Sequence, residues 1–274
     1  MMMNNFENRL SNNKNLVDKK LVNFFENRDI LTDSMNYAIR KGKRLRPILF
    51  LETLRMLDFP IDEDAISFSL SIEFIHCYSL VHDDLPEMDN DDYRRGDLTV
   101  HKKFDQAIAV LCGDSLLNFS YENMFNLVKN KDVKWIEAAR VISKYAGYCG
   151  MIEGQILDIK TEINELDDLI KIYEKKTANL FMAAVESAGV IAGLSKEKLN
   201  RLTDYALYMG ICFQIYDDIK DHDENEDVNI TNFKNKNQCF EIYNNFRTKA
   251  LESIKIFDNN TFFIELLDYL CTRI

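Results

Sequence analysis

Proline and glycine are scarce in this chain of 274 residues, which has only three prolines (Pro47, Pro60 and Pro86) and nine glycines. Because these residue types mark turns, their scarcity excludes a turn-dense β architecture. The long stretches without proline are rich in Leu, Ile, Lys, Glu and Ala, which favour helices. With 46% hydrophobic residues available for a core, we predict an all-α fold.

Long apolar runs, paired cysteines and excess positive charge are also missing. No apolar run approaches the roughly 18 residues of a membrane-spanning helix, and residues 1–20 lack the apolar segment of a signal peptide. The six cysteines show no CxxC or metal-ligand spacing, so we expect most of them to be reduced and buried. A net charge of −11 argues against a nucleic-acid partner. We therefore expect a cytoplasmic protein with no integral membrane segment.

The acidic residues gather in two clusters, with seven carboxylates in residues 83–97 and another seven in residues 217–227. The spacing is D-D-x-x-x-x-D from Asp83 to Asp89 and D-D-x-x-D from Asp217 to Asp221, and each cluster closes an apolar stretch. One such cluster alone would most often be a solvated helix end, but two of them indicate a metal site. Mg²⁺ suits it, because this ion takes one or two carboxylates and completes its octahedron with waters and substrate phosphates.

Basic residues accompany these carboxylates. Five bases stand among the seven residues from Arg40 to Arg46, and Arg94 and Arg95 follow the first acidic cluster. The first basic segment alone would be read as a solvated loop or a nucleic-acid patch. No aromatic residue interleaves these bases, however, and a glycine and a proline fix a bend there. Because guanidinium groups fork onto phosphate oxygens, the combination of acid and base predicts a diphosphate site.

The residues between Pro60 and Pro86 fit either a strand or a helix. Apolar residues at positions 66, 68, 70 and 72 alternate strictly, which is typical of a strand. The stretch contains no turn signal over about 25 residues, which is far too long for an ordinary strand. We therefore predict a helix, in which His76 and Asp83 share a face and Tyr78 lies below Asp83.

The remaining helices are predicted from the recurrence of apolar residues. One starts at residue 16 and includes Phe24 and Phe25, after a polar segment 1–15 that we expect to be frayed. Glycines at 147, 150 and 154 predict a close helix approach, residues 222–238 a loop, and asparagine pairs at 244–245 and 259–260 two breaks. The other expected helices span residues 104–128, 133–148, 169–193, 199–221 and 240–270.

Five motifs, read in order, resemble one known family: K-G-K-R-L-R-P, H-C-Y-S-L-V-H-D-D-L-P-E-M-D-N-D-D-Y-R-R-G, G-Q-I-L-D, K-T and F-Q-I-Y-D-D-I-K-D. They are similar to those of the trans-isoprenyl diphosphate synthases, most closely the bacterial farnesyl diphosphate synthases, over residues 35–225. The resemblance implies one helical domain over residues 1–274, built as a bundle of about ten or more mostly antiparallel helices around a central apolar cavity. It also implies a homodimer.

The resemblance assigns a role to each motif. About three Mg²⁺ ions would bridge the protein to an allylic diphosphate once substrate is bound; their ligands would be Asp83, Asp89 and Asp217, with Asp221 in the outer shell. The groups that hold this allylic diphosphate would be Arg94 and Lys176, with Thr177 and Gln214 beside it. The groups that hold isopentenyl diphosphate would be Lys43, Arg46, His76 and Arg95. The residues expected to carry catalysis are Asp83, Asp89, Lys176 and Asp217.

In the reaction of this family, diphosphate leaves with metal assistance, the alkene of isopentenyl diphosphate attacks the allylic cation, and a proton is lost. No Ser–His or Cys–His nucleophile is needed. In the family, an aromatic residue five positions before the first aspartate limits the growth of the tail. Tyr78 stands at that position, so the resemblance favours a C15 product, farnesyl diphosphate, over a C20 product.

This chain departs from the family pattern in three places. Lys41 replaces the first of two usual glycines, and Lys220 interrupts the second aspartate motif at a usually apolar position. The lysine that the family places after this motif is missing. Asn229 stands where that lysine is expected, and Lys234 or Lys236 are possible substitutes.

Three alternative functions follow. A terpene cyclase also ionises a prenyl diphosphate with aspartate clusters, but it has no second diphosphate for Lys43, Arg46 and Arg95 to hold. A geranylgeranyl diphosphate synthase would differ in the length of its product. The missing lysine keeps a third alternative open, a weakly catalytic regulatory subunit that binds prenyl diphosphates.

Overall fold

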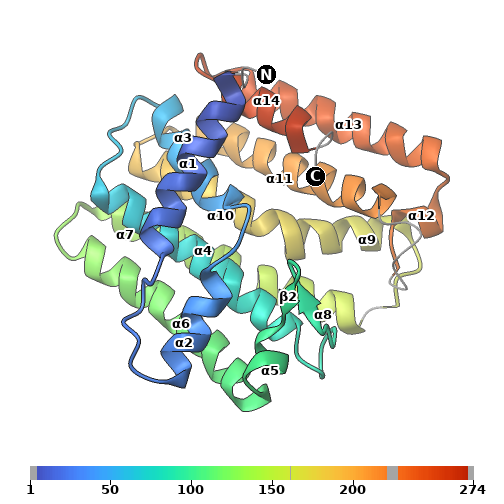
Figure 1. The fold of residues 1–274 in the computed structure, drawn as a ribbon. Helices are drawn as coiled ribbons and strands as arrows, with labels where there is room; N and C mark the ends of the chain where they lie inside the picture. The colour runs from blue at the N-terminus through green and yellow to red at the C-terminus, as the bar shows by residue number, and fades with distance from the viewer. Residues whose placement is uncertain (1–4, 161, 221–227, 271–274) are drawn as a thin grey trace. The chain divides into compact units, whose positions relative to one another are not determined.

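The computed structural model describes residues 5–160, 162–220 and 228–270, which are helical over most of their length (Figure 1). They form two compact units. The first unit holds the described residues up to Leu51 together with Ile61–Ala139, and the second holds Glu52–Pro60 together with the described residues from Arg140 onward.

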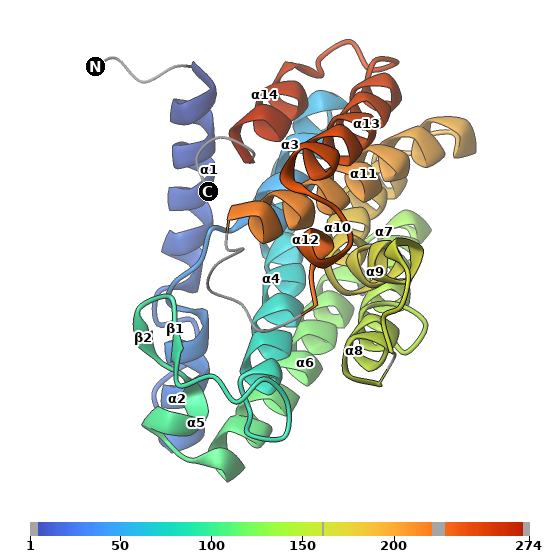
Figure 2. The ribbon, with the colours of Figure 1, turned by 90° about the vertical axis from the view of Figure 1, so that its right-hand side faces the viewer.

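The central helix of the first unit is α4 (Glu63–Asp83), which lies beside α6 (Gln106–Val128) (Figures 1 and 2). Its apolar residues and the polar residues between them are buried alike: Phe68, Ser69, Leu70, Ser71 and Ile72. A helix that is buried all round needs no polar face, and this explains how an alternating pattern can belong to a helix. The prediction of a helix rather than a strand is confirmed.

The other elements of the first unit surround α4 and α6. The helix α1 (Asn5–Leu21) begins at Asn5, so the expectation of a frayed segment was wrong for residues 5–15. Phe24 and Phe25 lie beyond the end of α1, where they pack against the rings of Phe74 and Phe119 at centroid distances of 4.9–5.8 Å. The remaining elements are α2 (Ile30–Ile39), the strands β1 (Tyr93–Arg94) and β2 (Asp97–Leu98), and α5 (Val100–Lys103). Two further helices, α3 (Leu45–Met56) and α7 (Val133–Ala146), have residues in both units.

The central helix of the second unit is α11 (Lys196–Lys220), which packs against α10 (Asn179–Ile191) and α13 (Lys236–Ile254) (Figure 1). One continuous helix was expected over residues 169–193. The structure instead has α9 (Leu166–Ile172), a π-helix η1 (Tyr173–Ala178) and then α10. The π-helix packs against both α11 and α8 (Met151–Lys160).

The last part of the second unit corrects two expectations. A loop was predicted over residues 222–238; residues 222–227 lie outside the described part of the chain, and the rest contains the short helix α12 (Ile230–Phe233) and the start of α13. The break at 259–260 is confirmed, because it separates α13 from α14 (Thr261–Leu270). The break at 244–245 was wrong, because α13 runs through it.

The all-α fold is confirmed, with more than ten helices in the described part of the chain. Among the described helices, none is long and apolar enough to cross a membrane. Four cysteines are buried as expected, whereas Cys149 is exposed and Cys271 lies outside the described residues. The single domain and its central cavity stay predictions.

Candidate functional site

The first aspartate cluster begins at the end of α4, where Asp83 is the last helical residue. Pro86 cannot continue the helix, and the chain turns back on itself. The backbone N–H of Asp89 donates to the carbonyl oxygen of Asp83 at 2.8 Å, and that of Asn90 to the carbonyl of Leu85 at 3.0 Å. Asp83 is half-buried and Asp89 is exposed. The spacing D-D-x-x-x-x-D thus brings two aspartates together at one helix end.

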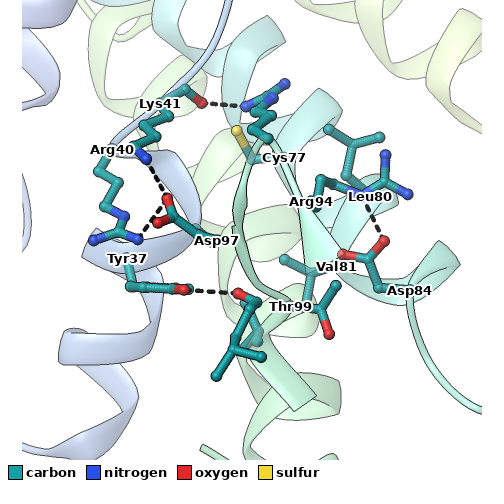
Figure 3. Close-up of a pocket in the computed structure, with 14 residues that line it drawn as sticks. Tyr37, Arg40, Lys41, Cys77, Leu80, Val81, Asp84, Arg94, Asp97 and Thr99 are labelled. Atoms are coloured by element: carbon teal, nitrogen blue, oxygen red, sulfur yellow. Dashed lines mark hydrogen bonds and ion pairs between the residues drawn. The ribbon is translucent and has the colours of Figure 1, made fainter. Parts of the chain in front are cut away.

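The second aspartate of this cluster, Asp84, is buried and holds an arginine. Arg94 donates from Nε to Asp84 Oδ1 at 2.5 Å (Figure 3). It also donates from Nη2 to Asp91 Oδ2 at 3.2 Å. Burial raises the pKa of Asp84 to about 6, although the positive charge of Arg94 opposes this shift. Arg94, which we expected to hold the allylic diphosphate, is therefore bound to carboxylates of its own loop.

Arg95 contacts the basic segment 40–46, whereas Arg94 contacts the acidic cluster. It forms the turn of the β1–β2 hairpin with Gly96, and both residues have left-handed φ angles, 54° and 79°. Its Nη1 donates to the carbonyl oxygen of Lys41. Nearby, Asp97 pairs with Arg40 at 2.7 Å and with Lys41 at 2.5 Å (Figure 3).

A small pocket lies between α2, α4 and this hairpin, and Figure 3 shows its lining. Both hairpin arginines line it, together with Asp84 and Lys41. Tyr37 closes one side, because its hydroxyl donates to the carbonyl of Leu98 at 2.6 Å. The hairpin is thereby fixed to α2 with its two arginines at the pocket.

One of the five clustered bases, Arg44, has a structural role that the sequence analysis missed. Its side chain is fully buried, and it donates from Nε to Asp18 and from Nη1 to Glu73, each at 2.8 Å. Its Nη2 donates to the carbonyl of Ile39 at 2.6 Å. Glu73 could have indicated this role, because a carboxylate within an apolar helix requires a buried cationic partner.

The structure brings Arg46, His76 and Arg95 together. Burial lowers the pKa of His76 well below its usual value, and the positive charges of Arg46 and Arg95 add to this effect. Burial also lowers the pKa of Arg46 to about 10, with Glu73 opposing and Arg95 reinforcing the shift. Lys43 is exposed on the same basic segment. A neutral histidine surrounded by arginines is suited to binding an anion such as a diphosphate.

Tyr78 is buried on α4, and its hydroxyl has no hydrogen-bond partner among the described residues. Burial raises its pKa, and the charge of nearby Asp83 contributes to the shift. Its ring lies 5.8 Å from that of His82. The expected position of Tyr78 below Asp83 is therefore confirmed.

The second aspartate cluster begins near the end of α11, where Asp217 is half-buried and Asp218 is buried. The carboxylate of Asp218 accepts hydrogen bonds from the Tyr173 hydroxyl, from Gln214 Nε2 at 3.0 Å and from the backbone N–H of Ile230 at 3.0 Å. Sequence reasoning gave no role to Asp218 or Tyr173. Asp221, expected in the outer shell of the metals, lies outside the described residues.

The lysine motif lies in the π-helix η1. A Cβ atom on Gly154 of α8 would stand 2.3 Å from the backbone nitrogen of Lys176, and one on Gly210 of α11 would stand 2.7 Å from Cα of Ala178. Glycine is therefore required on both sides, and the predicted close approach is confirmed at Gly154. The ammonium group of Lys176, on η1, forms an ion pair with Asp158, on α8, at 2.5 Å.

Two further predicted residues of this second unit lie together. The hydroxyl of Thr177 donates to Gln214 Oε1 at 3.0 Å, and Gln214 in turn donates to Asp218. The structure thus joins Thr177 and Gln214 in one hydrogen-bonded chain directly beside Lys176.

Asn229, which stands where the family lysine is expected, is the N-cap of α12. Its side chain accepts a hydrogen bond from the backbone N–H of Thr231 at 3.0 Å. Lys234 is half-buried at the C-cap of the same helix, and Lys236 is exposed at the start of α13.

Among the described residues, no group of three or more His, Cys, Asp or Glu side chains is arranged to hold a metal ion by itself. Mg²⁺ does not need such a cage, because substrate phosphates and waters supply most of its ligands. Asp83 and Asp89 in the first unit, and Asp217 in the second, are hard oxygen donors of the kind it prefers. The chemistry of this donor set fits Mg²⁺.

Comparison with known proteins decides the family. The profile described as Polyprenyl synthetase matches residues 28–237. The chain belongs to this family. It is 40% identical to a farnesyl diphosphate synthase of Micrococcus luteus over 211 residues, which cover 76% of this chain and 72% of that protein. The predicted resemblance to the trans-isoprenyl diphosphate synthases, and with it the prediction of a prenyltransferase, is confirmed.

Solved structures agree with this assignment. An FPP/GFPP synthase from Zymomonas mobilis gives a TM-score of 0.87 at 28% identity, with 97% of this chain and 99% of that chain covered. A geranyltransferase from Helicobacter pylori, solved with magnesium and isoprenyl diphosphate, gives 0.82 at 28% identity, with 98% and 97% covered. The isoprenoid synthase type of fold is therefore also confirmed.

Proposed function

We propose that this chain condenses an allylic diphosphate, dimethylallyl or geranyl, with isopentenyl diphosphate, head to tail, to give farnesyl diphosphate. The main support is the cluster of two arginines, Arg46 and Arg95, around the neutral His76, which lies in the same unit as the aspartate pair at the end of α4. A second diphosphate needs such a cluster in addition to the metal-binding aspartates. A terpene cyclase, with a single diphosphate, does not.

Each polar group has a place in this proposal. Asp83, Asp89 and Asp217 would hold Mg²⁺, which would supply positive charge to neutralise the leaving diphosphate. The allylic diphosphate is held by Arg94 and Lys176, with Thr177 and Gln214 beside it. Isopentenyl diphosphate is held by Lys43, Arg46, His76 and Arg95.

In the reaction, the bond between C1 of the allylic chain and the diphosphate oxygen breaks, and both electrons leave with diphosphate. The alkene of isopentenyl diphosphate then attacks the allylic cation, forming the new C–C bond. A proton is lost, and the departed diphosphate is placed to accept it. Cations such as Lys176 and Arg94 stabilise the charge that develops on this leaving group.

The decisive experiment incubates the protein with dimethylallyl diphosphate and radiolabelled isopentenyl diphosphate, with and without Mg²⁺. We expect a C15 product that requires the metal. A C20 product would favour a geranylgeranyl diphosphate synthase. No condensation under any metal condition would favour the regulatory subunit.

The length of the product is assigned to Tyr78, which is buried below Asp83. Replacing it with alanine removes the ring that blocks the growing tail, so Tyr78→Ala should shift the product from C15 to longer chains on thin-layer chromatography. An unchanged C15 product from this variant would remove Tyr78 from this role.

A homodimer in the cytoplasm completes the proposal. Helix α6 exposes three large apolar residues, Val110, Leu111 and Phe125, which are 42–67% exposed. An apolar helix face of this kind is suited to burial against a second copy. Light scattering coupled to gel filtration should give twice the chain mass, and a monomer mass would contradict the dimer.

A further inference from the structure

The buried carboxylate of Asp218 joins three segments of the second unit. Its Oδ2 accepts from the Tyr173 hydroxyl at the first residue of η1 and from the backbone N–H of Ile230 at the first residue of α12. Its Oδ1 accepts from Gln214 on α11, and Gln214 accepts from Thr177 near the end of η1. The π-helix is thus tied to α11 at both of its ends through one carboxylate.

This double attachment acts on a backbone conformation that is rare. A π-helix is a wide turn with poor intrinsic stability, so the surrounding structure has to hold it. Because Gly154 and Gly210 have no side chain, the backbone of η1 can lie close to both neighbouring helices. The hydrogen bond from Tyr173 to Asp218 holds η1 against α11. The residue that η1 presents next to Thr177 is Lys176.

We infer that Tyr173 and Asp218 are positioning residues for Lys176: their hydrogen bond, together with the Gln214–Thr177 link, sets where the lysine ammonium meets the allylic diphosphate. The inference rests on the proposed function for the role of Lys176. It assigns the two adjacent aspartates different tasks, with Asp217 facing the metal and Asp218 holding the lysine segment.

The same carboxylate also holds the segment that follows the second acidic cluster. The N–H of Ile230 is the first donor of α12, and Asp218 fixes it only one residue after the N-cap Asn229. Loosening Asp218 should therefore release two segments together, η1 and α12. A residue with a purely local packing role would not couple them.

The test is a double-mutant cycle on the full chain. Tyr173→Phe removes one hydroxyl and should lower kcat about tenfold, the effect of one lost hydrogen bond to a charged group, with KM for isopentenyl diphosphate unchanged. In a Lys176→Ala background the same substitution should have no further effect on kcat, because the group that it positions is gone. Equal losses in both backgrounds would overturn the inference.

Hydrogen exchange gives a readout that does not depend on activity. Asp218→Asn weakens the shared acceptor and should speed amide exchange in residues 173–178 and in residues 230–233 together. Unchanged exchange in both segments would overturn the inference even if kcat fell. If the protein condensed no substrate at all, the proposed function would fail, whereas exchange would still decide whether Asp218 couples the two segments.

Two variants guard against trivial explanations. Tyr205→Phe is the matched control, because Tyr205 is also a buried tyrosine on the same unit that donates to a carbonyl, that of Phe263 at 2.7 Å. Tyr205→Phe should leave kcat unchanged. A tenfold loss of kcat in this variant would show that the effect of Tyr173→Phe is not specific to its contact with Asp218, and would overturn the inference. Should Tyr173→Phe lose the near-ultraviolet circular dichroism of the fold, Asp218→Asn replaces it in the same cycle with the same expected outcomes.

Discussion

Two helices of this protein end in a pair of adjacent aspartates, and the two pairs share one arrangement. In each pair the first aspartate is half-buried and the second is buried: Asp83 and Asp84 at the end of α4, Asp217 and Asp218 near the end of α11. The buried member holds a neighbouring segment and acts as an anchor, and the proposed function assigns the first member to Mg²⁺ as a ligand. Under that proposal, each Asp-Asp motif combines a ligand and an anchor.

The pairs differ in what the anchor holds. Asp84 binds the guanidinium of Arg94, a charged partner from the loop that follows. Asp218 accepts hydrogen bonds from neutral donors: a tyrosine hydroxyl, a glutamine amide and a backbone N–H. The first anchor therefore holds a cation directly, and the second holds the backbone segment that carries Lys176.

The largest loss of kcat is expected when the first aspartate of an Asp-Asp pair is replaced. Asp83→Ala should lower kcat about a thousandfold, because it removes a metal ligand that stabilises the leaving diphosphate. Steady-state kinetics at saturating Mg²⁺ measures this. Glu122→Ala, an exposed acid on α6, is the control and should leave kcat unchanged. A loss of tenfold or less in Asp83→Ala would remove the distinction between ligand and anchor.

Lys176 and Arg46, which the proposal assigns to different diphosphates, should fall into two kinetic classes. Lys176→Ala should lower kcat about a hundredfold, because its charge acts on the leaving group, whereas Arg46→Gln should raise KM for isopentenyl diphosphate about tenfold with little change in kcat. Initial rates with each substrate varied in turn give both parameters. If both variants altered the same parameter, the assignment of Lys176 and Arg46 to different diphosphates would be wrong.

The anchors should matter more to stability than the ligands. Asp218→Ala leaves two buried donors and one half-buried donor without this acceptor and should lower the free energy of unfolding by about 3 kcal/mol. Asp217→Ala should cost less than about 1 kcal/mol, since its side chain is half-exposed. Urea unfolding followed by circular dichroism compares the two. Equal costs would mean that the carboxylate of Asp218 is not the anchor.

His76, which lies beside Arg46 and Arg95 in the first unit, should give the stability of the protein a small dependence on pH. His76 stays neutral in the folded protein because burial and nearby arginines lower its pKa, whereas in the unfolded chain it takes up a proton near its usual pKa of about 6.5. The unfolded state then binds more protons, so the contribution of His76 to stability is present at neutral pH and is lost as the pH falls below about 6.5.

This effect is measured against His76→Asn. The difference in free energy of unfolding between the unmodified protein and the variant should shrink between about pH 7.5 and 5.5, with a slope of at most about 1.4 kcal/mol per pH unit. A difference that stays constant over this range would show that His76 is not held neutral.

The order of the helices and the ends that carry the aspartates could be predicted from the sequence, because they depend on local features. The scarcity of proline indicated helices, and Pro86 marked the turn that brings Asp89 back to Asp83. The spacing of the motifs was sufficient to indicate the family.

Other parts of the site could not be predicted, because they depend on contacts between distant segments. Nothing local distinguishes Arg44 from Arg46, yet Asp18 and Glu73 bury the former and leave the latter beside His76. The π-helix at Lys176 depends on two glycines that lie 22 residues before and 34 residues after it in the sequence. Such pairings become visible only in the folded chain.

The most direct test of the division between ligand and anchor is the Mg²⁺ concentration that gives half-maximal condensation. Asp83→Asn and Asp217→Asn should raise it by about tenfold or more, whereas Asp84→Asn and Asp218→Asn should leave it within about twofold of the unmodified protein, even where they lower kcat. If the buried members raised the Mg²⁺ requirement as much as the first members, both aspartates of each pair would be metal ligands, and the division of each pair into a ligand and an anchor would be contradicted.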